Sequence, residues 1–242
     1  MSVQADGTGD FLTYVNGDNF APGTGDFNIG FWLYINTDED SVNDVFLIGG
    51  TIGSGPVLGV YTTSSGTNLE LAHPDFTNIA SATSLSTATW YYVVGSRGGT
   101  TARLRIFDDT TSTTPINGAN GETSTGFTTN ITTYDSMRVG EWWAGDTTLP
   151  AEWEKLSIDV GTEWTNAQCR TESQSYDYTQ AGTEWGTWEL TNVDADANGI
   201  NDTSGNARNF TNSGMVAGSN GPPSQLTASA TILLQMMMQG AV

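Results

Sequence analysis

Residues Ala102–Phe107 read ARLRIF, an alternation in which the even-numbered positions are apolar and Arg103 and Arg105 fall between them. Period-two alternation is typical of a β-strand with one buried face, so we expect the two arginines to face water. The run that precedes it, WYYVVGS at Trp90–Ser96, has the length and composition of a second strand. The segment 90–107 therefore predicts β-structure.

Similar short runs recur on both sides of this segment, separated by clusters of Gly, Ser and Asn. Such spacing predicts an all-β protein with an antiparallel β-sandwich of the jelly-roll type. One short helix is expected at Asn166–Ser173, with Thr165 as its N-cap and with Arg170 and Glu172 on its solvated side. The remaining predicted strands are Phe11–Val15, Phe27–Ile35, Asp44–Ile48, Val57–Thr62, Asn68–Ala72, Ser136–Gly140, Glu154–Val160 and Trp185–Leu190.

The charge balance narrows the range of partners. The chain has 242 residues, with 27 Asp and Glu against 7 Lys and Arg and a formal net charge of −20. Nucleic-acid phosphates and anionic membranes both attract clustered Lys and Arg, so we expect neither partner. With 37% hydrophobic residues, including 8 Trp, the chain can bury a sizeable core and is predicted to fold.

The number of cysteines and the length of the apolar runs indicate in which cellular compartment the protein acts. The single Cys169 excludes an intrachain disulfide, and we expect it to be a small, half-buried residue. Residues 1–15 lack the basic and apolar regions of a Sec signal, and no apolar run approaches the roughly 20 residues that span a bilayer. The composition is that of an extracellular β-protein, yet we expect no export signal.

The chain is predicted to form one sandwich domain over residues 1–217. Residues 218–242 are predicted to be a Gly/Pro linker, GSNGPPS at 218–224, followed by an uncharged tail that contains three adjacent Met. Two interpretations of the tail stay open. It is either a last element that closes the core or an apolar segment that docks on a neighbouring subunit.

Three segments in order carry a family resemblance: GDFNIGFWLYI at 25–35, ATWYYVVG and ARLRIFDD at 88–95 and 102–109, and MRVG and WEKLSI at 137–140 and 153–158. They resemble the laminin-G-like jelly-roll domains of the concanavalin A-like lectin/glucanase superfamily. The resemblance implies a lectin-like sandwich with Trp32 and Trp90 as packing residues, and it implies little about function. WEL at 188–190 and NDTSGN at 201–206 resemble a segment that usually precedes the family's first strand, which implies that residues 176–217 are a permuted terminal segment.

The sharpest local motif is DADANGIND at residues 194–202. Oxygen ligands at alternate positions, followed by a Gly and a carbonyl, are what a loop needs to wrap Ca²⁺. The expected ligands are Asp194, Asp196, Asn198, Ile200 and Asp202. Position 12 is not Glu, so the motif is not an EF-hand, and a loop of Asx turns without a metal stays an alternative.

No catalytic group is predicted. The related laminarinases carry a carboxylate triplet of the form E-x-D-x-x-E, which this chain lacks. Glu152 and Glu154 share one face of their strand, and simple alternation places Asp159 on the opposite face. The sole histidine, His73, is expected to end a strand. We therefore expect a protein without enzymatic activity.

A glycan site is predicted around Trp142 and Trp143, which follow Glu141 and precede a turn containing Asp146. Adjacent strand residues point to opposite faces, so at least one of the two indoles should be exposed. An exposed indole can stack on a sugar ring while carboxylates accept hydrogen bonds from its hydroxyls. A Trp that covers an interface or a loop is the alternative.

Two functions stay open. The first is a non-enzymatic structural or adhesion protein on the surface of a virus particle, in particular a bacteriophage capsid decoration or fibre-type protein, because virion proteins act outside cells without an export signal. Its partners would be other virion or capsid proteins, or further copies of itself, bound through the C-terminal tail. The alternative is a secreted or cell-surface carbohydrate-binding module with a glycan as partner. The expected location is the virion surface or the extracellular space.

Overall fold

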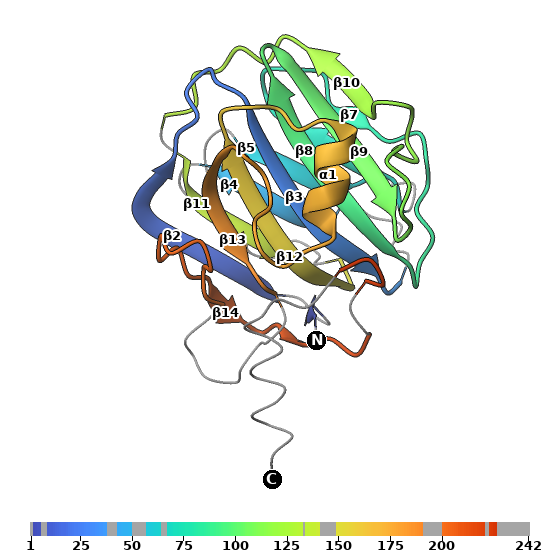
Figure 1. Cartoon of the computed structure of the whole chain (residues 1–242). Helices are drawn as coiled ribbons and strands as arrows, with labels where there is room; N and C mark the ends of the chain where they lie inside the picture. Colours follow the sequence, from blue (N-terminus) through green and yellow to red (C-terminus); the bar gives the residue numbers. More distant parts are fainter. Residues whose placement is uncertain are drawn as a thin grey trace.

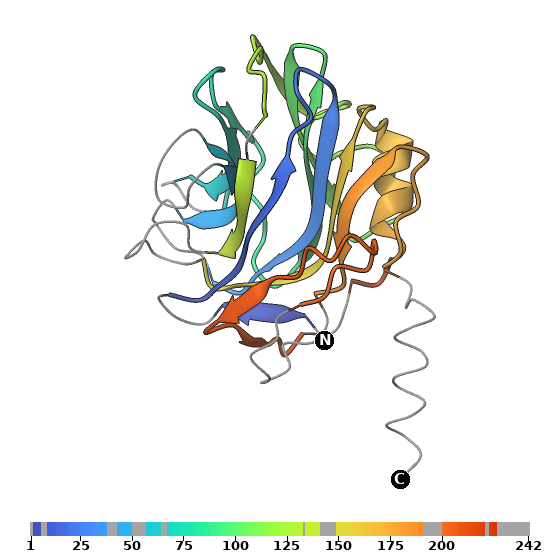
Figure 2. The same ribbon diagram turned by 90° about the vertical axis from the view of Figure 1, so that its left-hand side faces the viewer.

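The fold is a sandwich of two antiparallel β-sheets, seen from two sides in Figures 1 and 2. The computed structural model describes residues 2–5, 9–37, 43–49, 57–63, 67–132, 134–140, 149–190, 200–220 and 223–226, without the side chains of residues 16–19 and 57. One helix accompanies the strands in this described part. The predicted all-β antiparallel sandwich with a short helix is confirmed.

Sheet A contains eight strands: β1 (Val3–Ala5), β3 (Phe27–Ile35), β8 (Trp90–Gly98), β9 (Thr101–Asp108), β10 (Glu122–Thr125), β12 (Ala151–Val160), β13 (Thr183–Trp188) and β15 (Val216–Ala217). Their order is β10-β9-β8-β3-β12-β1-β15, and β13 also pairs with β12. The first residues of β12 pair with β1 and its last residues pair with β13, so two strands share one of its edges.

Sheet B contains seven strands: β2 (Phe11–Phe20), β4 (Asp44–Gly49), β5 (Val57–Thr62), β6 (Leu69–Ala72), β7 (Ile79–Ala80), β11 (Tyr134–Gly140) and β14 (Thr211–Ser213). Their order is β14-β2-β11-β4-β5-β6-β7. Each of the ten predicted strands overlaps an observed strand. The five strands that were not predicted have two to four residues each, too few for a period to show.

Alternation of side chains divides sheet A into an inner face, which packs on sheet B, and an outer face. On β3, Phe27, Phe31 and Leu33 belong to the core between the sheets. Trp32, from the intervening positions, joins a second apolar cluster with Trp90 on the outer face. Both tryptophans are buried packing residues as predicted, but they lie on the outer face rather than between the sheets.

Helix α1 (Asn166–Ser173) lies across the outer face of sheet A (Figure 1). Its predicted limits are confirmed, because Thr165 and Gln168 form a capping box. The Thr165 hydroxyl accepts from the Gln168 N–H at 3.3 Å, and the Gln168 side chain accepts from the Thr165 N–H at 2.8 Å. The sheet contributes Gly30 at the docking point, where a Cβ would collide with the Tyr92 hydroxyl.

The docked helix corrects three predictions about exposure. Arg170 and Glu172 are buried rather than solvated, because they face the sheet and not the solvent. Cys169 is fully buried rather than half-buried, and burial raises the pKa of its thiol to about 12. Arg105 of β9 is also buried. The outer face therefore holds charged groups that the sequence pattern assigned to water.

A β-bulge corrects the predicted direction of Asp159. Glu154 pairs with Trp32, whereas Leu156 pairs with the preceding residue of β3, so Lys155 is an extra residue in β12. The extra residue reverses the alternation beyond it, and Asp159 lies opposite Asn28 on the outer face. Asp159 therefore shares the face of Glu152 and Glu154.

The described C-terminal segments pack on the sandwich. Gly218 N–H donates to the Ser2 carbonyl at 2.8 Å, and the N–H groups of Ser224 and Gln225 donate to Asp109 at 2.6 and 3.0 Å. Leu226 is buried in the outer-face cluster. The predicted apolar tail begins at Gln225, and its residues 227–242 lie outside the described part, so both interpretations of the tail stay predictions. None of the described helices has the length and apolar character needed to cross a membrane.

Candidate functional site

The predicted glycan site lies outside the described residues. Glu141, Trp142, Trp143 and Asp146 fall in the stretch 141–148, which separates β11 from β12. The glycan site at these residues stays a prediction.

The predicted Ca²⁺ loop is described only at its end. Asp194, Asp196 and Asn198 lie outside the described residues, whereas Ile200 and Asp202 lie within them. No group of three or more His, Cys, Asp or Glu in the described part is arranged to hold a metal ion. Metal binding by this loop stays a prediction.

The two described residues of the loop use their oxygens within the protein. The Asp202 carboxylate accepts from the N–H groups of Ser204 at 2.9 Å and of Thr187 and Arg208 at 3.2 Å. The Ile200 carbonyl accepts from the Phe210 N–H at 2.9 Å. Asp202 therefore organises a turn and joins it to β13, whatever the preceding residues bind.

A pocket of about 570 Å³ opens beside the N-terminus of α1. Strand β9, the loop between β9 and β10, and the first turn of α1 form its walls. Most of the lining residues are polar, and the principal ones are Arg103, Arg105, Asn120, Glu163, Thr165 and Asn166. We take this pocket as the candidate functional site.

Local sequence explains how β9 and its loop shape the pocket. Alternation along β9 places Arg103 and Arg105 together on the outer face. Asn117 folds the loop back on the strand, because its side chain accepts from the Ile106 N–H and donates to the Leu104 carbonyl, both at 2.9 Å. The loop then passes so close to the strand that Gly121, at φ +72°, has no room for a Cβ.

Glu163 joins the two arginines. Its Oε1 atom accepts from Arg103 Nε at 2.8 Å, from Arg105 Nη2 at 3.0 Å and from the Ser96 hydroxyl at 3.0 Å. Burial alone would raise the pKa of Glu163, but the hydrogen bond and charge of Arg103 and the charge of Arg105 outweigh it, and the pKa is lowered. Glu163 is therefore ionised at neutral pH.

The pocket keeps unused hydrogen-bonding groups. The side chains of Arg103 and Glu163 are 21% and 19% exposed, and Glu163 Oε2 accepts no hydrogen bond from the described residues. Arg103 Nη1 makes only a 3.5 Å contact with the Asn120 carbonyl. Donors and an acceptor therefore remain available to a ligand.

A second polar cluster, the sealed cluster, lies beneath the other end of α1. Lys155 Nζ donates to Glu172 Oε1 at 2.6 Å, to the Glu172 carbonyl at 2.7 Å and to the Asp177 carbonyl at 3.2 Å. Ser157 donates to Glu172 Oε1 at 2.7 Å, and Thr179 donates to Oε2 from both its N–H and its hydroxyl. Lys155 and Glu172 are 0% exposed, so no ligand reaches them.

Three more carboxyl groups on β12 are buried on the same face of sheet A. Glu154 accepts from the Tyr176 hydroxyl, and Asp159 accepts from Asn28 at 3.1 Å and from the Tyr178 hydroxyl. Burial raises the pKa of Glu154 to about 7, although the Tyr176 hydrogen bond and the amino-terminal charge lower it. Glu152, the third, is also fully buried.

The sequence analysis did not identify the pocket. It placed Arg103 and Arg105 in water as ordinary surface charges, and it did not consider Glu163. A signal was nevertheless present, because two arginines at alternate positions of one strand are unusual in a chain with only 7 Lys and Arg. His73 directly follows the last residue of β6, close to the predicted strand end, with its Nε2 atom 2.8 Å from the Tyr134 hydroxyl.

Comparisons with known proteins identify the fold. No protein-family model and no curated protein matches the chain. A candidate carbohydrate-binding protein from Bacteroides ovatus superimposes with a TM-score of 0.59 at 12% identity, over 89% of this chain and 60% of its own. A heptameric SAP-like pentraxin from Limulus polyphemus superimposes with a TM-score of 0.56 at 13% identity, over 92% of this chain and 97% of its own.

The chain therefore has a lectin-like jelly-roll sandwich. At identities this low the likeness concerns the fold alone, and the chain spans less than two thirds of the Bacteroides ovatus protein.

Proposed function

We propose that this chain is a non-enzymatic, lectin-like carbohydrate-binding protein displayed on the surface of a virus particle. The open polar pocket beside α1 is the observation that carries the proposal. Its volume of about 570 Å³ falls within the range of about 300 to 1,000 Å³ that small-molecule sites occupy.

The pocket offers the hydrogen-bonding groups that a sugar requires. Sugar hydroxyls both donate and accept, so a sugar site needs donors and acceptors close together. Arg103 and Asn120 supply donors, the free Glu163 Oε2 atom supplies an acceptor, and the Thr113 and Thr114 side chains lie on the same wall. Because the Arg103–Glu163 contact fixes both groups, little conformational entropy is lost when a ligand binds.

Burial of the β12 carboxyl groups favours binding over hydrolysis. Glycoside hydrolysis requires two carboxyl groups that reach the substrate. Glu152, Glu154 and Asp159 share one face but are all 0% exposed, and Tyr176 and Tyr178 cover two of them. We therefore assign them to the fold.

The context of a virus particle is supported by composition. A net charge of −20 keeps a densely displayed protein soluble and repels nonspecific contacts. The apolar C-terminal tail would supply the contact with capsid proteins or with further copies of the chain. Detection of the chain at a fixed copy number in purified particles would support this context, and recovery only as a free secreted monomer would favour the carbohydrate-binding module outside a virion.

A glycan array tests carbohydrate binding. We expect the full chain to bind a restricted set of glycans, and we expect Arg103→Ala to reduce that binding at least tenfold because it removes charge-assisted hydrogen bonds. Arg138→Ala is the matched control, since Arg138 lies on β11 in the opposite sheet with its guanidinium 3.9 Å from the Phe11 ring centre. Equal loss in both variants would contradict the assignment of the pocket.

A further inference from the structure

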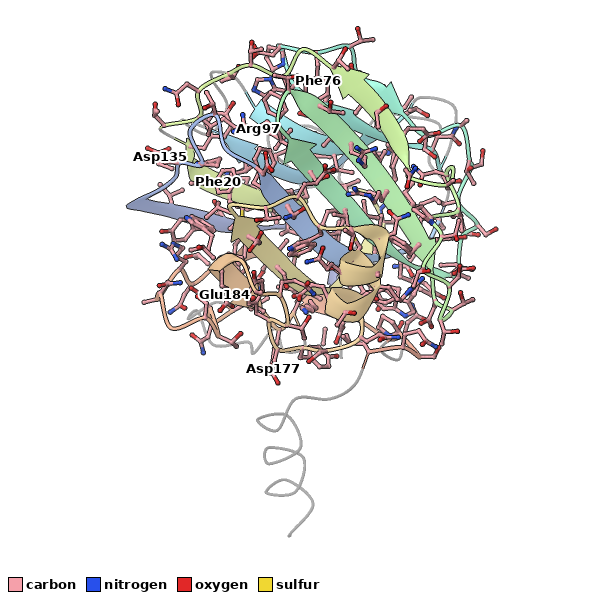
Figure 3. All side chains as sticks on the ribbon, turned by 45° about the horizontal axis from the view of Figure 1, so that its top comes forward. Phe20, Phe76, Arg97, Asp135, Asp177 and Glu184 are labelled. Atoms are coloured by element: carbon pink, nitrogen blue, oxygen red, sulfur yellow. The ribbon has the colours of Figure 1, made fainter. Side chains whose placement is uncertain are left out.

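The seven basic residues of this protein are distributed unevenly. Five of them contact neighbouring groups outside the pocket, which are carbonyls, an aspartate, a glutamate or aromatic rings. Arg97 is an example: it lies at one end of the sandwich (Figure 3) and donates to the carbonyls of Gly25, Thr129 and Gly23. The others are Lys155, Arg138, Arg170 and Arg208.

The remaining two basic residues, Arg103 and Arg105, both line the pocket beside α1. Glu163 is the one acidic residue that lines it, so the pocket has a net charge of +1 in a protein whose net charge is −20. Glu163 Oε1 cannot neutralise both guanidinium groups. A single excess positive charge is therefore exposed where the rest of the molecule is strongly negative.

The two guanidinium groups differ in what they can still bind. Arg105 is 5% exposed and held by Ser96 and Glu163, while its Nε–H donates to no group in the described part of the chain. Arg103 uses its Nε–H for Glu163, and its Nη2 group makes no hydrogen bond with the described residues. The Nη edge of Arg103 therefore faces the pocket with the paired donors that suit two anionic oxygens.

The first turn of α1 adds donors of the same kind. Asn166 and Ala167 line the pocket, and neither of their N–H groups has a hydrogen-bond partner among the described residues. The first turn contains no acidic residue, so the partial positive charge of the helix N-terminus is not offset within the helix. The backbone N–H groups of the first turn and the guanidinium group of Arg103 thus both favour a negatively charged ligand group.

We propose that the pocket beside α1 recognises a sugar through a single anionic group, a carboxylate or a sulfate, held between Arg103 and the first turn of α1. This inference rests on the proposed carbohydrate-binding function and specifies its ligand class. The net charge of −20 repels a long polyanion over distances up to the Debye length of about 8 Å, whereas the contact with one anionic group is short and little screened. The ligand is therefore a saccharide with an isolated acidic unit rather than a polyanionic chain.

Two copies of one glycan array, one with its carboxylates converted to methyl esters, test the inference with the full chain. We expect binding to acidic glycans that falls at least tenfold on the esterified copy if the anion is a carboxylate. Sulfated glycans survive esterification, so binding confined to them on both copies identifies sulfate. Equal binding of neutral and acidic glycans on both copies overturns this inference and leaves the proposed function intact. Binding on neither copy overturns both.

A pair of variants at Asn166 separates the helix N–H group from the side chain. Asn166→Pro removes the N–H at the first helical position, where proline fits, and Thr165 already has the extended backbone that precedes proline, at φ −70° and ψ 165°. Asn166→Ala keeps the N–H and removes the side chain. We expect Asn166→Pro to weaken acidic-glycan binding severalfold more than Asn166→Ala, and equal binding by the two variants would exclude the Asn166 N–H group from the site.

Discussion

The two ion-pair clusters beside α1 have the same chemistry and opposite access to solvent. Lys155 and Glu172, in the sealed cluster, are 2.6 Å apart and fully buried. Arg103 and Glu163, in the pocket, are 2.8 Å apart and about one fifth exposed. Every Nζ donor of Lys155 has an acceptor, whereas Arg103 keeps donors that no described residue uses.

The difference shows how one short helix creates both a structural and a binding site. The last turn of α1 and residues 174–180 close over the bulge at Lys155, so the charges there serve the fold. The first turn, β9 and the loop between β9 and β10 instead line an open pocket. Exposure at the two helix ends thus decides which charged group can bind a ligand.

The largest effect is expected in the sealed cluster. Lys155→Met should lower the free energy of unfolding by about 3 to 5 kcal/mol, because it leaves the Glu172 carboxylate buried without a counter-charge. The pKa of Glu172 is held down by Lys155 and by hydrogen bonds from Thr179 and Ser157, against the effect of burial. Denaturant unfolding of the purified chain measures the loss.

The double variant Lys155→Met with Glu172→Leu is the control for this loss. It removes both charges and should recover much of the stability, since well-packed apolar pairs often match a buried ion pair. If the single variant unfolds with wild-type stability, the sealed cluster is not closed in solution and the comparison with the pocket fails.

The next largest effect on the free energy of unfolding is expected at Glu154, and this effect depends on pH. The pKa of Glu154 in the folded protein is raised to about 7, so its contribution to stability is fully present below pH 4.5 and is lost as pH rises through about 7. A difference of that size corresponds to about 3 kcal/mol. Glu154→Gln should therefore be more stable than the wild type at pH 8 and similar to it near pH 4.5.

The difference between the Glu154→Gln variant and the wild type isolates this group from the other carboxylates. It is measured by denaturant unfolding at pH 4.5 and pH 8. A difference that is the same at both values would mean that Glu154 is hydrated and ionised, and that residues 174–180 do not seal the outer face.

Local sequence was sufficient for most of the fold. Alternation and turn residues located ten strands, and Thr165 as the expected N-cap located the start of the helix. Local sequence could not reveal the bulge at Lys155, because a bulge depends on how β12 pairs with β3 and not on the order of residues within β12. The prediction that Asp159 lies on the face opposite Glu152 and Glu154 was wrong for this reason.

The pocket could not be predicted from the residue pattern of any single strand. The pattern of β9 correctly placed Arg103 and Arg105 on one face, but exposure depends on what covers that face. Helix α1 follows β9 by 58 residues and covers Arg105 more fully than Arg103. A charged residue on an amphipathic strand is assigned to water by default, and long-range docking reversed that assignment here.

The smallest effect on stability is expected in the pocket itself. Arg103→Ala should lower the free energy of unfolding by less than about 1 kcal/mol, because its ion pair is partly hydrated and Arg105 still neutralises Glu163. A double-mutant cycle with Glu163→Gln should accordingly give a coupling energy well below that of Lys155 and Glu172. A coupling as large as in the sealed cluster would make the Arg103–Glu163 pair part of the fold. Loss of glycan binding in Arg103→Ala could then no longer be attributed to the missing donors, whereas a small coupling together with lost binding assigns Arg103 to the ligand.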